Sequence, residues 1–199
     1  MKVLLTGANG FIGKNLCVAL REQEKYEIYE FNRETSKEAL ESYLSKADFI
    51  FHLAGVNRPK DISEFKEGNI DLTKLIVKTL EDIGRNVPIA FSSSTQIDQE
   101  NPYGQSKLAA EKEVMMYAER TGSPCYIFRF PNVFGKWCKP NYNSFIATFC
   151  NNISNEIEIS INDPNAKVRL VYIDDVCDSL LGLLHGKYEP GLCSVPTEY

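Results

Sequence analysis

Tyr103 and Lys107 form a pair whose side chains could transfer a proton together. The two residues stand four positions apart at the start of a predicted helix, so they share one helical face. A phenol ordinarily has a pKa near about 10 and is a poor acid or base at neutral pH. A nearby ammonium stabilises the phenolate, so we expect Lys107 to lower the pKa of Tyr103 towards the range where general acid–base catalysis is efficient.

Hydroxyl groups lie shortly before this pair in the sequence. Ser92, Ser93 and Ser94 end a predicted strand, and Ser94 comes nine residues before Tyr103. A hydroxyl at a strand end could hold the oxygen atom that receives a proton from the phenol. A Tyr-x-x-x-Lys spacing is common by chance on amphipathic helices, but the serine-ended strand in front of it makes a catalytic role more specific.

A glycine-rich segment near the start of the chain could cradle a phosphate group. Residues 6–13 read Thr-Gly-Ala-Asn-Gly-Phe-Ile-Gly, after a short apolar run and before a segment with helical spacing. Glycine permits a tight turn and a close approach to a pyrophosphate, and the free N–H groups of a helix start supply donors. A strand–helix turn without a ligand is the alternative. We predict a dinucleotide site made by Gly7, Asn9, Gly10, Phe11, Ile12 and Gly13.

The residue about twenty positions beyond the last glycine often selects the dinucleotide. An acid at that position grips the ribose in proteins that use NAD, whereas this chain has Arg33. A guanidinium can pair with a 2′-phosphate in a forked geometry, while an acid would repel that group. Arg33 therefore favours NADP(H) over NAD(H), with a surface arginine at a strand end as the alternative.

The elements that must position these residues alternate along the first part of the chain. Apolar runs predict strands over residues 3–6, 27–32, 48–53, 88–94 and 125–130. Segments with helical spacing lie between them, over residues 11–22, 37–45, 72–83 and 106–120. This alternation predicts an α/β fold with a doubly wound, Rossmann-type parallel sheet and right-handed crossovers.

The pattern changes after residue 130. Residues 131–143 are rich in Pro, Asn, Lys and aromatic residues and are predicted to form a functional loop. We expect a helix over 144–151, strands over 156–161 and 167–173, and a helix over 174–185. The prediction is an NADP-binding Rossmann core over residues 1–130 and a small C-terminal substrate lobe over residues 131–199. That lobe looks short enough to be truncated.

Composition argues against several other classes of protein. The chain has 199 residues and a formal net charge of −5, whereas a nucleic-acid-binding domain needs a basic face. The six cysteines form no Cys-x-x-Cys pair and the two histidines stand apart from them, so no metal site is expected. No apolar run approaches the roughly 20 residues of a membrane span, and the start lacks a signal-peptide pattern. We expect a soluble, cytoplasmic protein without nucleic-acid or membrane partners.

The glycine turn, the serine and the Tyr-x-x-x-Lys pair together resemble the extended short-chain dehydrogenase/reductases, the group of the NAD-dependent epimerases and dehydratases. The motifs Thr-Gly-x-x-Gly-x-x-Gly and Ser-Tyr-Lys occur in the family's order, and the resemblance covers nearly the whole chain. The resemblance implies that Ser94 holds the reacting oxygen and that Tyr103 transfers the proton. It implies that Lys107 binds the nicotinamide ribose and tunes Tyr103.

Two further segments fit the same resemblance. Residues 52–55, His-Leu-Ala-Gly, match the family's segment beside the adenosine half of the cofactor, so Leu53, Ala54 and Gly55 are implied to border it. Asn69 resembles the asparagine that orients a central helix, although Leu72 stands where a glycine is usual.

A narrower resemblance links the chain to the reductase domain of capsular-polysaccharide enzymes. It rests on residues 54–59 (Ala-Gly-Val-Asn-Arg-Pro), residues 101–104 (Asn-Pro-Tyr-Gly) and the tryptophan-containing run 134–144. It implies NADPH-dependent reduction of a keto group on a nucleotide-linked deoxy-amino sugar of the UDP-2-acetamido-2,6-dideoxy-hexulose type. In that family a cupin domain follows, and none is recognisable within residues 1–199. Three questions are therefore open: whether a separate cupin-type partner exists, whether the chain is a fragment of a longer protein, and whether it forms a homodimer.

Five residues could contact such a substrate. Asn132 resembles the asparagine that contacts nucleotide sugars in extended members of the family. Arg58, Lys136 and Lys139 could offset the charge of a diphosphate, with a solvated surface as the alternative for each lysine. Arg169 stands one residue away from the usual position of a diphosphate-binding arginine. On a strand, such an offset moves the side chain to the opposite face.

The same triad serves other reactions, so alternatives stay open. An epimerase would retain NAD, which Arg33 disfavours. A dehydratase usually has an acid pair directly after the active hydroxyl, whereas Thr95 and Gln96 follow Ser94. A non-catalytic NADP-binding regulator on the same fold commonly lacks the tyrosine or the lysine, and this chain keeps both.

Overall fold

A parallel sheet forms the centre of the computed structural model, which describes residues 1–142 and 144–197. Asn143, the last residue of the predicted loop 131–143, lies outside the described residues, as do Glu198 and Tyr199. In the described part of the chain, six strands pair in the order β2-β1-β3-β4-β5-β8. Their bounds are β1 (Lys2–Thr6), β2 (Glu27–Phe31), β3 (Phe49–His52), β4 (Ile89–Ser94), β5 (Cys125–Phe130) and β8 (Gly191–Cys193).

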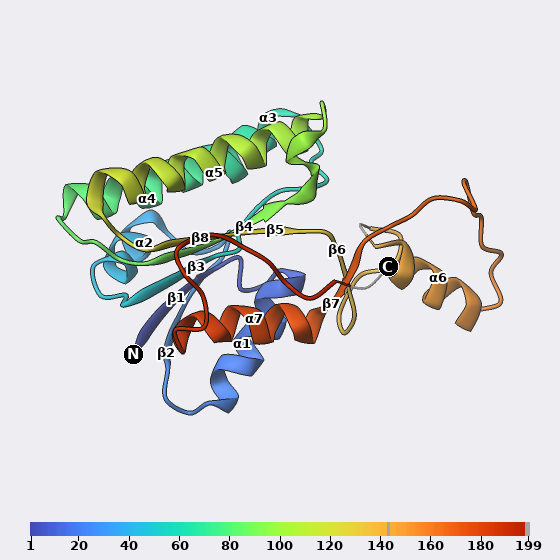
Figure 1. Ribbon diagram of the computed structural model, residues 1–199, viewed down its shortest axis with the longest axis horizontal. Coiled ribbons are helices and arrows are strands. Elements are labelled where there is room, and N and C mark those ends of the chain that lie inside the picture. Colours follow the sequence, from blue (N-terminus) through green and yellow to red (C-terminus); the bar gives the residue numbers. More distant parts are fainter. Residues whose placement is uncertain (143, 198–199) are drawn as a thin grey trace.

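Helices cover both faces of this sheet (Figure 1). On one face lie α1 (Phe11–Glu22) and α7 (Ile173–Leu184), which pack against each other. On the other face lie α2 (Lys37–Leu44), α4 (Leu72–Asp82) and α5 (Pro102–Thr121). All the pairings in the sheet are parallel, so the predicted doubly wound, Rossmann-type α/β fold is confirmed.

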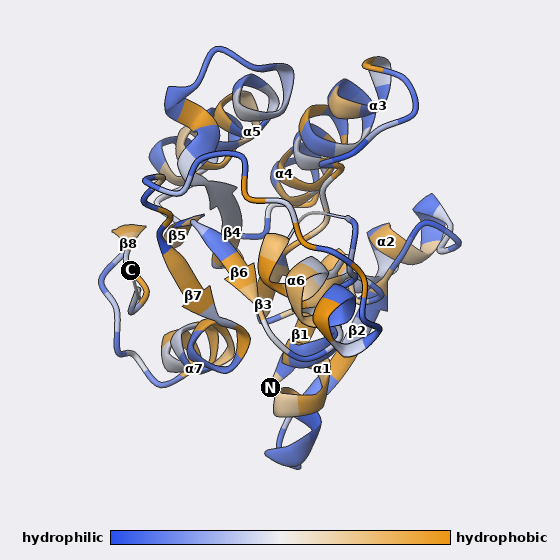
Figure 2. Cartoon of the chain, turned by 90° about the vertical axis from the view of Figure 1, so that its right-hand side faces the viewer, coloured by the Kyte–Doolittle hydropathy of each residue, from blue (hydrophilic) through white to orange (hydrophobic). Residues whose placement is uncertain are grey.

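Two apolar clusters sandwich the sheet because successive strand side chains point to opposite faces. Leu4 and Ile50 pack with α2, α4 and α5, whereas Val3, Leu5 and Phe51 pack with α1 and α7. Figure 2 shows the resulting apolar colour along the inner strands. A strand buried on both faces needs apolar residues at successive positions, which explains the near-continuous apolar runs of the sequence.

A smaller part of the structure projects from one end of the sheet (Figure 1). It contains the parallel pair β6 (Asn132–Phe134) and β7 (Leu170–Tyr172), and the helix α6 (Phe145–Ser154). Ser144 caps α6 by accepting a hydrogen bond from the backbone N–H of Ala147. Residues after 130 thus fall into two regions. The elements β6, β7 and α6 form the projecting part, whereas α7 and β8 pack on or in the central sheet. The assignment of residues 131–199 to substrate binding stays a prediction.

Several local elements differ from the sequence-based expectation. Residues 156–161 form no strand, although they were expected to, and residues 167–173 form only the short strand β7. The side chains of residues 156–161 are exposed, so no packed neighbour stabilises an extended pairing there. The strands β6 and β8 and the turn of π-helix at Lys66–Asp71, which follows α3 (Ser63–Phe65), were not predicted.

Helix α5 begins four residues earlier than predicted, which brings Tyr103 into its first turn. Asn101 is the N-cap, because its side-chain oxygen accepts a hydrogen bond from the backbone N–H of Gly104 at 2.7 Å. Pro102 occupies the first helical position, where its missing N–H costs nothing. The cap therefore fixes the direction in which α5 leaves the end of β4.

Candidate active site

The glycine turn between β1 and α1 lies tightly against the end of β3. Gly7 has a φ of +73°, and a Cβ atom on it would lie 2.8 Å from backbone atoms of Ala54. A Cβ on Gly13 would lie 2.2 Å from the carbonyl oxygen of Gly7. Helix α1 starts after Gly10 without a side-chain cap, so its first N–H groups remain available to an anion. This bare backbone fits the pyrophosphate of a dinucleotide, and Phe11 and Ile12 anchor the helix in the core.

The end of β2 holds the other side of this turn. The side-chain oxygen of Asn32 accepts a hydrogen bond from the backbone N–H of Asn9 at 2.9 Å, and Gly7 donates to the carbonyl of Phe31. Arg33 follows Asn32 directly and is exposed. The backbone of Arg33 is therefore held next to the turn, on the side where an adenosine ribose is bound in folds of this kind. Sequence reasoning missed Asn32, whose short polar side chain directly after the strand was the available signal.

The segment after β3 connects the turn to the proton-transfer pair. The backbone N–H of Leu53 donates to the carbonyl of Thr6, and that of Ala54 donates to the Thr6 hydroxyl. A Cβ on Gly55 would lie 3.1 Å from Asn69 and 3.4 Å from the Lys107 ammonium. Leu53, Ala54 and Gly55 therefore lie between the glycine turn and Lys107, in the position predicted to border a cofactor.

Ser94, Tyr103 and Lys107 come together at the carboxyl end of β4. The Ser94 side chain lies close enough to the Tyr103 phenol to lower its pKa, and it accepts a hydrogen bond from the backbone N–H of Gln96. The Tyr103 ring packs near Phe65, with ring centroids 6.0 Å apart. Ser94 and Lys107 are both buried, and Tyr103 is partly buried. A substrate oxygen could contact the serine and tyrosine hydroxyl groups together, as a proton transfer requires.

The pKa of Tyr103 shifts in the opposite direction to our expectation. Burial raises the pKa of Tyr103, and the nearby Ser94 side chain only partly opposes this effect. Burial also lowers the pKa of Lys107 to about 7, so this ammonium is only partly protonated at neutral pH. A partly neutral lysine stabilises a phenolate weakly, so the expected lowering by Lys107 is wrong for the protein alone. A buried phenol with a raised pKa is well suited to remain protonated until it donates.

Lys107 lies in an apolar site with two electrostatic partners. Its Nζ atom lies 4.5 Å from the centroid of the Phe91 ring, a cation–π contact. The Glu111 carboxylate, one helical turn further along α5, partly offsets the lowering of the Lys107 pKa. Tyr103, Lys107 and Glu111 therefore share one face of α5, four residues apart.

Glu111 is itself held by two side chains from neighbouring strands. One carboxylate oxygen accepts a hydrogen bond from Ser93 at 2.7 Å, and the other accepts one from Arg129 at 2.6 Å. The carboxylate is nearly fully buried, and it forms an ion pair with Arg129. Sequence reasoning missed this triad, because Ser93, Glu111 and Arg129 are far apart in the chain and meet only through the pairing of β4 with β5.

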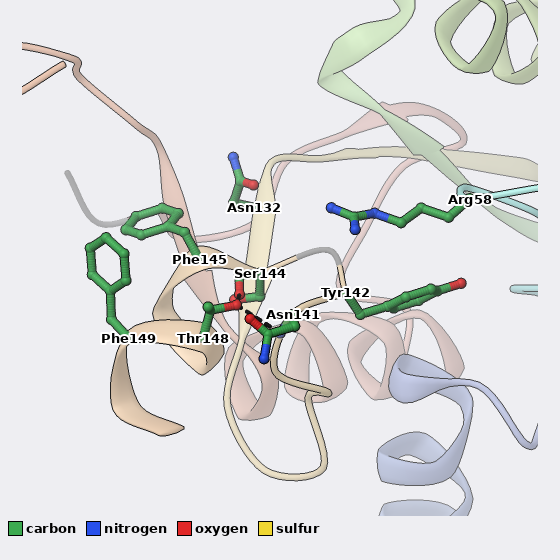
Figure 3. Close-up of a pocket in the computed structure, with 8 residues that line it drawn as sticks. All are labelled: Arg58, Asn132, Asn141, Tyr142, Ser144, Phe145, Thr148 and Phe149. Carbon is green, nitrogen blue, oxygen red and sulfur yellow. Dashed lines mark hydrogen bonds between the residues drawn. The ribbon is translucent and has the colours of Figure 1, made fainter. Parts of the chain in front are cut away.

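A cavity of about 390 Å³ lies between the loop after β3, strand β6 and helix α6. Figure 3 shows the side chains around it, with the rings of Phe145 and Phe149 on one side and Arg58 opposite. Asn132 also lines the cavity, so the structure brings together two of the predicted substrate residues. Such a mixture of aromatic and polar side chains is typical of a site for an organic ligand. The remaining lining residues are Asn141, Tyr142, Ser144 and Thr148.

Arg58 is positioned across this cavity by an aromatic contact (Figure 3). Its guanidinium carbon lies 5.6 Å from the centroid of the Tyr142 ring. The Tyr142 hydroxyl donates a hydrogen bond to the side chain of Asn57 at 2.9 Å. The two loops that border the cavity are therefore tied together, with Arg58 at the rim.

The other three predicted substrate residues do not line this cavity. Lys136 is exposed, and its ammonium lies 5.1 Å from the centroid of the Trp137 ring, beside a second cavity of about 440 Å³ near the glycine turn. Lys139 is exposed on the loop after β6. Arg169 is also exposed, and its backbone carbonyl accepts a hydrogen bond from the N–H of Asn132 at 3.3 Å. Arg169 is thus hydrogen-bonded through its backbone to Asn132, which lines the cavity.

Residues 1–142 and 144–197 contain no group of three or more His, Cys, Asp or Glu residues arranged to hold a metal ion. In the same ranges, every helix is too short or too polar to cross a membrane.

With this geometry in view, comparison with known proteins identifies the family. A model of the NAD dependent epimerase/dehydratase family matches residues 3–190, so the chain belongs to this family. A relative from Pseudomonas aeruginosa, named UDP-2-acetamido-2,6-beta-L-arabino-hexul-4-ose reductase, is 50% identical over 187 residues. That alignment covers 94% of this chain and 50% of the relative. Both the broad and the narrower resemblance of the sequence analysis are thereby confirmed.

Solved structures agree with this assignment. The capsular polysaccharide assembling protein CapF from Staphylococcus aureus superimposes with a TM-score of 0.87 and 46% identity, over 100% of this chain and 55% of that one. UDP-glucuronic acid 4-epimerase from Bacillus cereus, solved with NAD, has the same fold, with a TM-score of 0.86 and 20% identity over 100% of this chain and 80% of that one. The chain spans about half the length of the Pseudomonas relative and of CapF.

Proposed function

We propose that this chain carries out the NADPH-dependent reduction of a keto group on a nucleotide-linked deoxy-amino sugar. The sugar is of the UDP-2-acetamido-2,6-dideoxy-hexulose type, and the product serves the synthesis of surface or capsular polysaccharide precursors. The observation that carries the proposal is that Ser94, Tyr103 and Lys107 come together at the carboxyl end of β4, with Ser94 and Lys107 buried. The 50% identity to a reductase named for a sugar of this type supports the substrate class.

The chain's own residues account for the proton side of the reaction. NADPH, when bound at the glycine turn, supplies the hydride that adds to the carbonyl carbon. Ser94 holds the carbonyl oxygen, and Tyr103 donates its phenolic proton to that oxygen as the alcohol forms. A proton from solvent then restores the phenol, and Lys107 stabilises the transient phenolate to the extent that it is protonated.

The choice of NADPH over NADH rests on Arg33. Arg33 is exposed and follows Asn32, which binds the glycine turn, so its side chain could reach the adenosine ribose. A guanidinium favours a 2′-phosphate through charge-assisted, forked hydrogen bonds. NAD(H) is the weaker cofactor in this proposal.

The substrate is proposed to occupy the cavity of about 390 Å³. Arg58 would pair with the diphosphate, Asn132 would hydrogen-bond to the nucleotide sugar, and the Phe145 and Phe149 rings would contact its apolar parts. Lys136, Lys139 and Arg169 would add positive charge around the rim.

An absorbance assay tests this function directly. The purified chain is mixed with NADPH or NADH and with candidate UDP-keto-sugars, and the nicotinamide absorbance and the sugar products are followed. We expect net oxidation of NADPH with formation of one alcohol per cofactor, and slower oxidation of NADH. Interconversion of sugars without net cofactor consumption would instead indicate an epimerase with retained NAD. Cofactor binding without any turnover would indicate a non-catalytic regulator, and either result would contradict the proposal.

The proposal extends to the assembly of the protein. A homodimer and a separate cupin-type partner are both compatible with a chain that spans about half the length of its relatives. Light scattering of the purified chain measures the first, and binding to an added cupin protein measures the second.

A further inference from the structure

A chain of buried hydrogen bonds runs from Thr6, at the start of the glycine turn, to Thr73 in α4 and Asn69 just before it, with His52 at its centre. The Thr6 hydroxyl lies 2.7 Å from the Nδ1 atom of His52. The Nε2 atom of His52 lies 2.8 Å from the Thr73 hydroxyl. Thr73 donates to the backbone carbonyl of Asn69 at 2.7 Å. The sequence analysis assigned no role to His52 or Thr73.

The hydrogen-bond partners determine the direction of every bond in this chain. Thr73 donates its single hydroxyl proton to the Asn69 carbonyl, so its oxygen can only accept a hydrogen bond from His52. The Nε2 atom of His52 therefore carries the proton. The Nδ1 atom is then an acceptor, and the Thr6 hydroxyl donates to it. Thr6 in turn accepts from the backbone N–H of Ala54 at 3.2 Å. All the donors point the same way, from the turn towards Asn69.

The side chain of Asn69 extends this connection to the catalytic helix. Its amide nitrogen donates to the Val56 carbonyl at 3.0 Å and to the Ser106 hydroxyl at 2.8 Å. Ser106 donates to the backbone carbonyl of Tyr103 at 2.7 Å. Asn69 lies within the π-helical turn Lys66–Asp71, and such insertions often occur at functional sites. The connection thus runs from the cofactor turn to the backbone of the proton donor.

His52 can act only as a neutral link. Burial, with a smaller contribution from the Lys107 ammonium, lowers the pKa of His52 to about 3. The imidazole is fully enclosed and packs against Phe91, the ring that also contacts Lys107. It has no path to exchange a proton with a substrate, so a role as general acid or base is excluded on geometry.

We propose that His52 is a positioning residue of the active site, held as the Nε2–H tautomer between Thr6 and Thr73. In this role it holds the glycine turn and helix α5, which carries Tyr103, in a fixed position relative to each other. The inference rests on the proposed reductase function for its effect on turnover, but the tautomer and the hydrogen-bond chain are independent of that function. Reactions that need the donor and the cofactor aligned are sensitive to displacements of about 1 Å.

The tautomer is measured first, on the wild-type chain without substrate. Only two histidines are present, so long-range ¹H–¹⁵N spectra of the imidazoles resolve His52 from His185. We expect His52 to show one protonated nitrogen, Nε2, and no titration between pH 5 and 9, while the exposed His185 exchanges rapidly. An Nδ1–H tautomer, or a His52 that titrates in this range, would overturn the proposal even if the protein is an active reductase.

Variants at Thr73 then test the effect on catalysis. Thr73→Val removes the link but keeps the shape, and Thr73→Ser restores the hydroxyl. We expect kcat to fall roughly 10- to 100-fold in Thr73→Val with a nearly unchanged KM for NADPH, and Thr73→Ser to recover most of the loss. Thr121→Val is the matched control, because Thr121 makes the same type of bond, to the Tyr117 carbonyl at 2.7 Å, at the far end of α5.

The outcomes separate this inference from the proposed function. If Thr73→Val loses stability as Thr121→Val does but keeps its kcat, Thr73 and His52 are merely structural and the proposal is wrong. If the wild-type chain reduces no keto-sugar, the proposed function fails. The tautomer measurement then still decides whether His52 links Thr6 to Thr73.

Discussion

At the scale of single residues, the proposed proton donor is a phenol that burial keeps protonated. Burial raises the pKa of Tyr103, and the nearby Ser94 side chain only partly opposes this. Replacement Tyr103→Phe removes the proton and little else, because the two rings have the same shape. We expect the turnover number to fall by about 10²- to 10⁴-fold, the usual contribution of general acid–base catalysis, with an unchanged Kd for NADPH. Single-turnover kinetics and fluorescence titration of NADPH measure the two quantities.

The control for this variant is the partly exposed Tyr126, a phenol outside the site, changed to Phe. Persistent turnover in Tyr103→Phe at the wild-type rate would contradict the assignment of the proton donor.

The buried lysine makes stability depend on pH. The pKa of Lys107 is about 7 in the folded protein, against an ordinary value near 10.5. Between these two values the unfolded chain binds more protons than the folded one, so stability rises with pH. We expect the wild type to gain stability relative to Lys107→Met from pH 7 to 10, by at most about 1.4 kcal/mol per pH unit. Urea unfolding of both proteins at several pH values measures this difference, and a flat difference would contradict the lowered pKa.

Much of the site could be predicted at this scale because its residues come from local patterns. The spacing of Tyr103 and Lys107 and the glycine turn are each contained in fewer than ten residues. The direction of the Tyr103 pKa shift could not be predicted, because it depends on burial by distant parts of the chain. The partners of Glu111 were missed for the same reason.

At the scale of elements, the packing of α1 against the glycine turn depends on one missing side chain. A Cβ on Gly13 would lie 2.2 Å from the Gly7 carbonyl, which belongs to the backbone and cannot move aside. We expect Gly13→Ala to lower the free energy of unfolding by about 1–3 kcal/mol and to weaken NADPH binding. Chemical unfolding and cofactor titration measure both effects.

A second helical glycine provides the control for this prediction. A Cβ on Gly182, in α7, would meet only the flexible side chain of Lys187 and the ring edge of Tyr188, at 3.2 Å. Gly182→Ala should therefore cost much less than Gly13→Ala. Equal losses in the two variants would show that the close contact at Gly13 is not special.

The elements that the sequence predicted well are those that carry their own periodic pattern. The bounds of α1 and β5 were predicted to the residue, because each is an apolar pattern bounded by clear turn residues. The short strands β6 and β8 contain three residues each and form only through pairing with β7 and β5. The expected strand over 156–161 has alternating isoleucines but no partner strand, so its local pattern was misleading.

At the scale of the whole molecule, the cavity beyond the sheet is proposed to select the substrate. Arg58 lies at its rim and is exposed, and it forms no ion pair with the other described residues. We expect Arg58→Ala to raise the KM for the UDP-sugar about 10-fold or more, with the Kd for NADPH unchanged, because a charged hydrogen bond to a diphosphate is lost. Steady-state kinetics with varied UDP-sugar measures the effect.

Lys112→Ala is a suitable control, because Lys112 is an exposed cation on α5 outside the cavity. If both variants raised KM equally, the loss would be one of overall charge, and the cavity would not be the diphosphate site.

The helix that borders this cavity contributes nothing to the apolar core. None of the described side chains of α6 is buried. The helical residues of the two apolar clusters come from α1 and α7 on one face of the sheet, and from α2, α4 and α5 on the other. The residues proposed to contact the sugar and the residues that form the apolar core are thus largely different. Substitutions in α6 should therefore cost little stability, so the proposed specificity could change while the central sheet stays intact.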